Sequence, residues 1–144
     1  FQEKFGDVLG AVLHEGIFLV FASSADTPLP MVASRDIAEI AVQELLADTQ
    51  TSEAVDIVGP EYTERQVARS LSVVLGKPLE VVPIPEPGWM KALVEAGFAP
   101  HIAESLADLY RADEQKRLGP RGDRSIRVTT DIDTTVRHVL AQEV

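Results

Sequence analysis

The sequence predicts an α/β fold that is rich in helices and has only a few short strands. Apolar residues recur at helical spacing in several segments, short apolar runs lie between those segments, and glycine or proline ends most of them. Strands that alternate with helices indicate an α/β arrangement. The 144 residues suit one domain, so we expect residues 1–144 to form a single unit.

The first half of the chain contains two expected helices and three expected strands. The first helix covers about residues 3–15, where apolar side chains recur on one helical face. The second runs from an N-cap at Ser34 to about Leu46. We expect its apolar stripe to be buried; the stripe consists of Ile37, Ala38, Ala41, Val42 and Leu45. The expected strands are Ile17–Phe21, Met31–Val32 and 54–58.

A capping box is the clearest signal in the second half. Thr63 at the N-cap and Gln66 at N3 can satisfy each other's backbone N–H groups, and the helix that they open ends at Gly76. A last helix from about Thr134 has Asp131 or Asp133 as a candidate N-cap. The remaining expected elements are a strand at 79–84, helices at 88–96 and 101–117, and a strand at 126–129.

These strands are too few for a complete sheet. The runs Ile17–Phe21 and 54–58 are largely apolar, as in strands that are covered on both faces. We therefore expect part of a sheet whose remainder lies elsewhere, with no complete nucleotide-binding sheet, although a self-sufficient small fold is the alternative. Because the sequence starts with Phe1 and not Met, we expect a cleavage product or a piece of a longer protein.

The charge balance and the lack of cysteine exclude several functions. The chain has 13 Lys and Arg against 23 Asp and Glu, a net charge of −10 that repels nucleic acid and anionic membrane surfaces. No cysteine is present to form disulfides, thiolate nucleophiles or zinc ligands. We expect no signal peptide, because no basic segment followed by an apolar one opens the sequence. We therefore expect a cytoplasmic protein with no nucleic-acid or membrane partner.

A search for catalytic motifs is mostly negative. The glycines that come nearest to a dinucleotide fingerprint, Gly6, Gly10 and Gly16, lie in or at the end of the first expected helix. A Tyr-x-x-x-Lys pair is missing, because Tyr62 and Tyr110 are followed four residues later by Gln and Glu. The three histidines are far apart, so we expect no metal site. The basic segment 116–127 is either an anion site or a solvated loop.

Four short motifs follow one another in a recognisable order. Phe1–Phe5 resembles a helix start of the Phe-Met-Glu-Asn-Phe type, although Lys4 stands where Asn is usual. Pro30–Ala38 is similar to a P-x-V-x-x-x-D-I-A segment, and Val58–Thr63 to a G-P-E segment that leads into a helix ending near Leu75–Pro78. In this order the motifs resemble the NmrA-like proteins, an atypical branch of the short-chain dehydrogenase/reductase superfamily.

The resemblance covers only the C-terminal half of such a protein. It implies the helix-rich C-terminal part of a Rossmann-like short-chain dehydrogenase/reductase fold, with one wall of the substrate cleft. NADP or NAD is implied for a full-length parent, whereas we expect this chain alone to bind no cofactor and to hold no catalytic residue. We expect Phe1, Phe5, Met31 and Trp89 to form the apolar, substrate-binding wall. Each of the four is alternatively part of the core.

Two functions follow from this resemblance. The first is the substrate-cleft portion of an NmrA-like NAD(P)-dependent oxidoreductase or redox sensor, which binds no dinucleotide and catalyses nothing alone. The alternative is a free-standing, noncatalytic binding or protein-interaction module. The expected substrate is small and apolar or aromatic. Because a cut sheet leaves unpaired strand edges, we expect homo-oligomers when the chain is produced alone.

Overall fold

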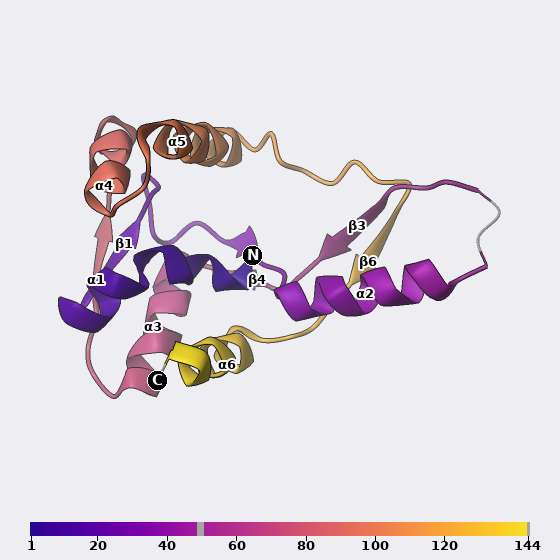
Figure 1. The fold of residues 1–144 in the computed structure, drawn as a ribbon, viewed down its shortest axis with the longest axis horizontal. Helices are drawn as coiled ribbons and strands as arrows, with labels where there is room; N and C mark the ends of the chain where they lie inside the picture. The colour runs from indigo at the N-terminus through magenta and orange to yellow at the C-terminus, as the bar shows by residue number, and fades with distance from the viewer. Residues whose placement is uncertain (49–50, 144) are drawn as a thin grey trace.

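Helices and short strands alternate along the chain, which confirms its mixed α/β, helix-rich character (Figure 1). The structure is a computed structural model that describes residues 1–48 and 51–143. The helices, with 3-10 segments marked η, are η1 (Gln2–Val8), α1 (Leu9–His14), α2 (Ser34–Leu46), α3 (Glu64–Leu75), η2 (Glu86–Gly88), α4 (Trp89–Glu95), α5 (Pro100–Glu114) and α6 (Ile132–Glu143). The strands are β1 (Ile17–Val20), β2 (Leu29–Pro30), β3 (Val55–Val58), β4 (Glu61–Tyr62), β5 (Glu80–Pro83) and β6 (Arg124–Arg127).

The described strands pair in three sheets of two strands each. β1 runs parallel to β5, with Ile17 opposite Glu80, and β3 runs parallel to β6, with Val55 opposite Arg124. The short strands β2 and β4 pair antiparallel. Small parallel sheets are unusual alone, because parallel strands are normally covered on both faces.

The hydrophobic core lies in the part of the molecule formed by η1, α1 and α3–α6 together with β1 and β5, here called the body. Its most deeply buried side chains come from elements that are distant in sequence: Val12, Phe18, Leu71, Trp89, Leu93 and Val136. No helix within the described residues has the length and apolar character that a membrane span requires.

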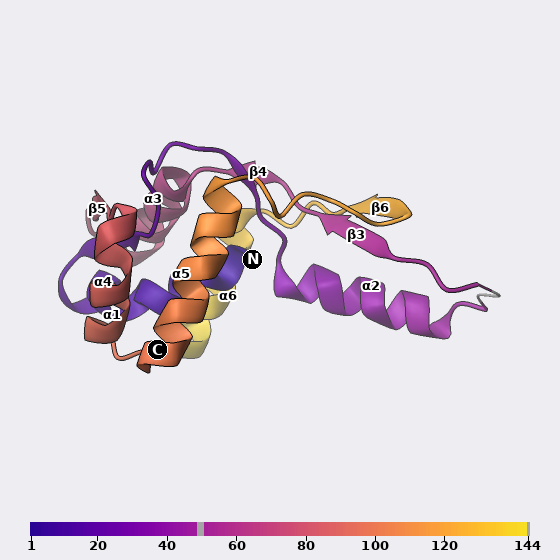
Figure 2. The same ribbon diagram turned by 90° about the horizontal axis from the view of Figure 1, so that it is seen from above.

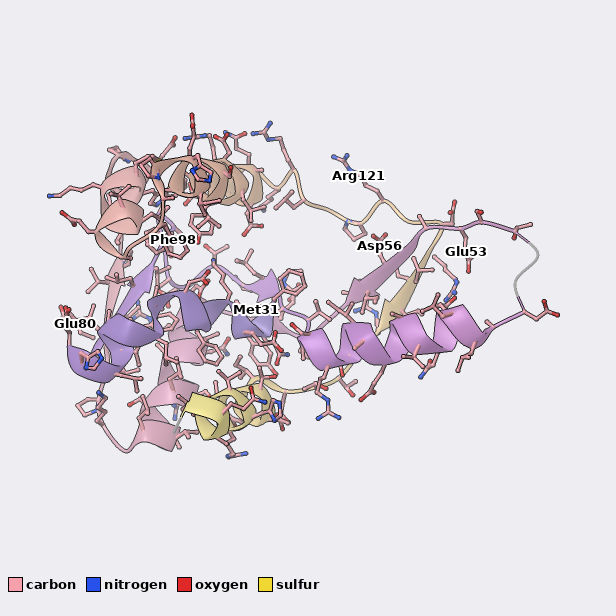
Figure 3. All side chains as sticks on the ribbon, viewed as in Figure 1. Met31, Glu53, Asp56, Glu80, Phe98 and Arg121 are labelled. Atoms are coloured by element: carbon pink, nitrogen blue, oxygen red, sulfur yellow. The ribbon has the colours of Figure 1, made fainter. Side chains whose placement is uncertain are left out.

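α2, β3 and β6 form an arm that extends away from the body (Figures 1 and 2). Arg124 of β6 holds the arm together, because its guanidinium lies 2.7 Å from Glu44 Oε2 of α2 and 2.8 Å from Glu53 Oε1. Met31 lies where arm and body meet, with Asp56 and Glu53 further along the arm (Figure 3). These ion pairs tie β6 to α2 and to the segment that precedes β3.

The two backbones that connect body and arm touch at Gly59. A Cβ at this position would lie 2.2 Å from the Met31 carbonyl oxygen, so only glycine fits. The Met31 N–H donates to the Pro60 carbonyl oxygen at 2.9 Å beside it. This contact fixes the point at which the arm leaves the body.

The apolar stripe predicted on α2 is not buried. Val42 is 55% exposed and Leu45 is 83% exposed, because no element of the described chain packs over them. Ser34 is also not the N-cap, since Ala33 takes that position and no side chain caps this end from within the segment. The stripe has the periodicity of a packed helix, but its neighbour is missing from the described residues.

Several other boundaries also differ from the prediction. The first expected helix divides into the tighter η1 and a short α1. The strand expected at Met31–Val32 lies at Leu29–Pro30 instead, where β4 is close enough to pair. On α5 the small residues Ala103 and Ala107 face the core, whereas the larger Leu109 is 49% exposed. Close packing against α4 thus favours the alanine face of α5.

The capping signals of α3 and α6, by contrast, predicted the ends of these helices correctly. Thr63 accepts a hydrogen bond from the Gln66 N–H at 3.1 Å, and Gln66 Oε1 accepts one from the Thr63 N–H at 2.8 Å. Gly76 ends α3 in the left-handed conformation, with φ 66°. Asp131 caps α6 by accepting from the Thr134 N–H at 2.7 Å.

Candidate functional site

A cleft of about 570 Å³ opens in the body between η1, the loop 22–29 and the last turn of α5. Sites for small molecules commonly have volumes of about 300–1,000 Å³. Charged and aromatic side chains from four separate segments line this cleft: Lys4, Phe21, Glu64, Tyr110, Asp113 and Glu114.

The loop 22–29 is held on both sides. The Asp26 carboxylate pairs with Arg65 through two hydrogen bonds of 2.7 and 3.0 Å, and the Arg65 N–H donates to the Ala25 carbonyl oxygen at 3.1 Å. This guanidinium lowers the pKa of Asp26 by hydrogen bonding. On the other side, the Ser23 N–H donates to Glu114 Oε1 at 2.6 Å. These contacts tie the rim of the cleft to α3 and α5.

Lys4 brings a positive charge to the cleft wall. Its Nζ lies 3.2 Å from Glu64 Oε1 and 4.8 Å from the centre of the Tyr110 ring. An ammonium over the face of an aromatic ring is attracted by the ring's quadrupole. The Glu64 side chain is only 12% exposed, so this ion pair is screened less than a surface pair. Two contacts thus fix the position of the Lys4 ammonium.

Tyr110 lies at the centre of an aromatic group. Its ring stacks on Phe21, with centroids 5.4 Å apart and planes 19° apart, and meets Trp89 edge-on at 5.9 Å. Burial raises the pKa of Tyr110 to about 12, and the negative charges of Asp7 and Glu64 contribute to this rise. The phenol therefore keeps its proton near neutral pH and can donate a hydrogen bond.

The charged side chains of the cleft are slightly negative in sum. Lys4 and Lys116 line it together with the three carboxylates of Glu64, Asp113 and Glu114. The whole chain has a net charge of −10, so the electrostatic potential of the rest of the molecule adds to the negative potential of the cleft. A neutral ligand enters such a cleft without the repulsion that an anion meets.

The four residues expected to form a substrate wall lie elsewhere. Phe1 is 69% exposed, whereas Phe5, Met31 and Trp89 are buried in one hydrophobic core. Trp89 is fully buried, and its indole N–H donates to the Ile84 carbonyl oxygen at 2.7 Å. The cleft's described lining includes none of the four, and their contact with a substrate stays a prediction.

Sequence patterns do not reveal the cleft residues, because these come from segments far apart. Lys4 and Tyr110 are 106 positions apart, and no local pattern joins them. The one available signal is Lys4 itself, which departs from the usual Asn in the motif that carries the family resemblance.

Carboxylates occupy the start of three long helices. Glu3 Oε1 accepts from the first N–H of α2 at 2.9 Å, Glu64 opens α3, and Asp131 caps α6. α5 starts with Pro100, which has no N–H. A dinucleotide binds its pyrophosphate at free helix N–H groups beside glycines, so these helix starts do not fit one. The described residues also contain no group of three or more His, Asp or Glu that could hold a metal ion.

Two curated relatives have detectable sequence similarity. The (4-alkanoyl-5-oxo-2,5-dihydrofuran-3-yl)methyl phosphate reductase of Streptomyces griseus is 32% identical over 104 residues, which cover 72% of this chain and 36% of the relative. The NAD(P)H azoreductase of Xenophilus azovorans is 30% identical over 80 residues, 55% of this chain and 28% of the relative. No protein-family model matches the chain.

Two solved structures share the fold. The Citrobacter sp. triphenylmethane reductase complexed with NADP(H) has a TM-score of 0.73 at 23% identity, over 92% of this chain and 47% of that protein. The NADPH-dependent quinone oxidoreductase QOR2 of Escherichia coli, complexed with NADPH, has a TM-score of 0.71 at 19% identity, over 97% of this chain and 50% of that protein.

This chain therefore spans half the length of these proteins or less. At identities below 25%, the structural likeness shows the fold, a helix-rich α/β arrangement that covers about half of a Rossmann-fold protein. The resemblance predicted from the sequence motifs is thereby confirmed: the chain matches about half of an NmrA-like NAD(P)H reductase.

Proposed function

We propose that this chain is the substrate-cleft portion of an NmrA-like NAD(P)H-dependent reductase or redox sensor, whose nucleotide is held by residues outside the chain. The relatives that it matches in part are reductases of a furanone phosphate, azo compounds, triphenylmethane dyes and quinones, as their names state. The cleft supports a role in substrate binding. The arm supports the proposal that residues outside this chain complete the sheet and hold the nucleotide. The observation that carries the proposal is the uncovered face of the arm.

The two strands of the arm have the features of part of a larger parallel sheet. β3 and β6 pair only with each other among the described strands, whereas parallel sheets are normally larger and covered on both faces. A cavity of about 550 Å³ separates α2 from β3, with Ile37 and Ile40 on the helix side and Val55 and Ile57 on the strand side. Further strands and helices of a Rossmann sheet would cover this apolar surface.

Two buried carboxylate oxygens near the start of α2 support the same conclusion. Asp36 Oδ1 accepts a hydrogen bond from the Thr130 hydroxyl at 2.6 Å, but Asp36 Oδ2 has no partner among the described residues. Glu3 Oε2 is likewise enclosed without a donor there. Buried carboxylate oxygens are normally hydrogen-bonded, so donors from a neighbouring segment are expected at both atoms.

In this role the chain would bind and orient the molecule to be reduced. The nicotinamide, when bound by the rest of the protein, would supply the hydride. The residues of this chain would hold the acceptor in the cleft, exclude water through the Phe21 and Tyr110 rings, and position donors such as Lys4 beside it.

The experiment compares two polypeptides, the 144-residue chain and the product of the complete reading frame. We expect NADPH to bind saturably to the longer product only, as measured by the enhancement of NADPH fluorescence. The longer product should also oxidise NADPH when a quinone or an azo dye is added. Saturable NADPH binding by the 144-residue chain would contradict the proposal. A reading frame that starts directly before Phe1 would favour the noncatalytic binding module instead.

A further inference from the structure

Tyr110 brings an unused hydrogen-bond donor to the cleft. The residue is 6% exposed and lines the cleft, yet its hydroxyl takes part in none of the hydrogen bonds among the described residues. The hydroxyl is also not one of the enclosed, unpartnered polar atoms, so it remains accessible. The hydroxyl of a buried tyrosine usually has a hydrogen-bond partner. Water takes this place in the open cleft, and a ligand with an acceptor atom would replace it.

The residues around Tyr110 hold its ring in place and keep its hydroxyl protonated. Phe21 stacks on the ring and Trp89 contacts it edge-on, so the hydroxyl cannot move freely. Burial and the carboxylates of Asp7 and Glu64 raise the pKa of the phenol, which keeps it a donor. A fixed donor selects an acceptor atom at one place, and a carbonyl oxygen meets this requirement.

The charges near Tyr110 favour a neutral ligand over an anion, because Lys4 and Lys116 line the cleft against three carboxylates. The ammonium of Lys4 is already paired with Glu64, and the carboxylates of Asp113 and Glu114 line the same cleft. The apolar part of the wall comes from the Phe21 ring and from Pro28 and Leu29, which suit a flat apolar molecule.

We propose that the Tyr110 hydroxyl donates a hydrogen bond to the carbonyl oxygen of a neutral, planar aromatic ligand in the cleft. Tyr110 is thus a residue that determines specificity for carbonyl compounds. That this ligand is the molecule to be reduced rests on the proposed function. Binding itself does not, because Tyr110 and the side chains around it all belong to this chain and no nucleotide takes part.

The test uses three probes of one shape: 9-fluorenone, fluorene, which has CH₂ in place of the carbonyl, and 9-fluorenone-4-carboxylate. Trp89 is the single tryptophan and its ring lies 5.9 Å from Tyr110, so its indole N–H resonance in a ¹H–¹⁵N spectrum reports on the cleft. Tyr110→Phe removes the hydroxyl and keeps the ring. Tyr62→Phe is the matched control, because the Tyr62 hydroxyl accepts from the Ile132 N–H away from the cleft.

We expect the native chain and Tyr62→Phe to bind fluorenone about three- to tenfold more tightly than fluorene, the effect of one neutral hydrogen bond. Tyr110→Phe should lose this preference and bind fluorene as before. The carboxylate should bind more weakly than fluorenone. The proposal is overturned if fluorenone leaves the Trp89 resonance unmoved, if Tyr110→Phe keeps the preference, or if the carboxylate binds best. Because no NADPH is present, these outcomes are independent of whether the longer product is a reductase.

Discussion

The hydroxyl of Thr135 donates a hydrogen bond to the side-chain oxygen of Gln2, so η1 and α6, whose two residues lie 133 positions apart, meet inside the core. Both side chains are at least 96% buried. The Gln2 amide nitrogen donates in turn to the carbonyl oxygens of Met31, at 3.1 Å, and Thr130, at 2.6 Å. One glutamine therefore joins η1 to α6 and to the segments that enter and leave the arm.

Replacing Gln2 by methionine should strongly destabilise the chain. The variant Gln2→Met keeps the length of the side chain but leaves the Thr135 hydroxyl and two carbonyl oxygens without their partner. We expect the free energy of unfolding to fall by about 2–4 kcal/mol. Urea titration measures it. Gln43→Met, on the exposed face of α2, is the control and should change it by less than about 0.5 kcal/mol. An equal effect of the two changes would contradict the role of Gln2.

The capping box of α3 should contribute measurably to stability. Thr63→Ala removes the acceptor for the Gln66 N–H, and we expect a loss of about 1 kcal/mol in the free energy of unfolding. Ser34→Ala should be nearly neutral, because Ser34 lies in the first turn of α2 and is not its N-cap. Thermal unfolding followed by circular dichroism compares the two. A larger effect at Ser34 would show that the helix starts are wrongly assigned.

Tyr110 should make the chain sensitive to alkaline pH. The folded chain keeps the phenolic proton up to about pH 12, whereas the unfolded chain releases it near its ordinary pKa of 10. Stability due to this group is therefore complete below pH 10 and is lost between about pH 10 and 12. The free energy of unfolding of Tyr110→Phe should fall less than that of the native chain over this window, as measured by urea unfolding at a series of pH values. Parallel curves for both proteins would exclude a buried phenol at Tyr110.

The exposed stripe of α2 should make the isolated chain self-associate. Leu45 and Leu46 are 83% and 82% exposed on the arm, near β3 and β6, whose outer edges pair with no other described strand. We expect dimers or larger species in sedimentation velocity runs, and Leu45→Lys with Leu46→Lys should shift the distribution toward monomer. Leu109→Lys, a similar change on the body, should not. A monomeric native chain at high concentration would contradict this expectation.

Sequence patterns predicted those features that local contacts decide. The capping box at Thr63 and the left-handed Gly76 depend on residues within one turn of each other, so the start and end of α3 were correct. On α2 the same kind of pattern gave the right helix and the wrong burial, because periodicity shows that Val42 and Leu45 need a neighbour but not where that neighbour is.

The cleft could not be predicted in the same way. Phe21, Lys4 and Tyr110 meet only because β1, η1 and α5 pack together, and none of the three lies in a motif with a known chemical role. Trp89, expected in a substrate wall, supports the cleft from behind instead, through its contact with Tyr110.

The backbone contact at Gly59 limits how far the arm can move relative to the body. In the proposed reductase, hydride transfer would require donor and acceptor atoms within about 3–3.5 Å of each other, so a change in the angle between the arm and the body would interrupt it. With no side chain between them, the backbones at Gly59 and Met31 act as a rigid joint. Alanine at position 59 would force the two backbones apart and, in the proposed reductase, would change the distance between the two reactants.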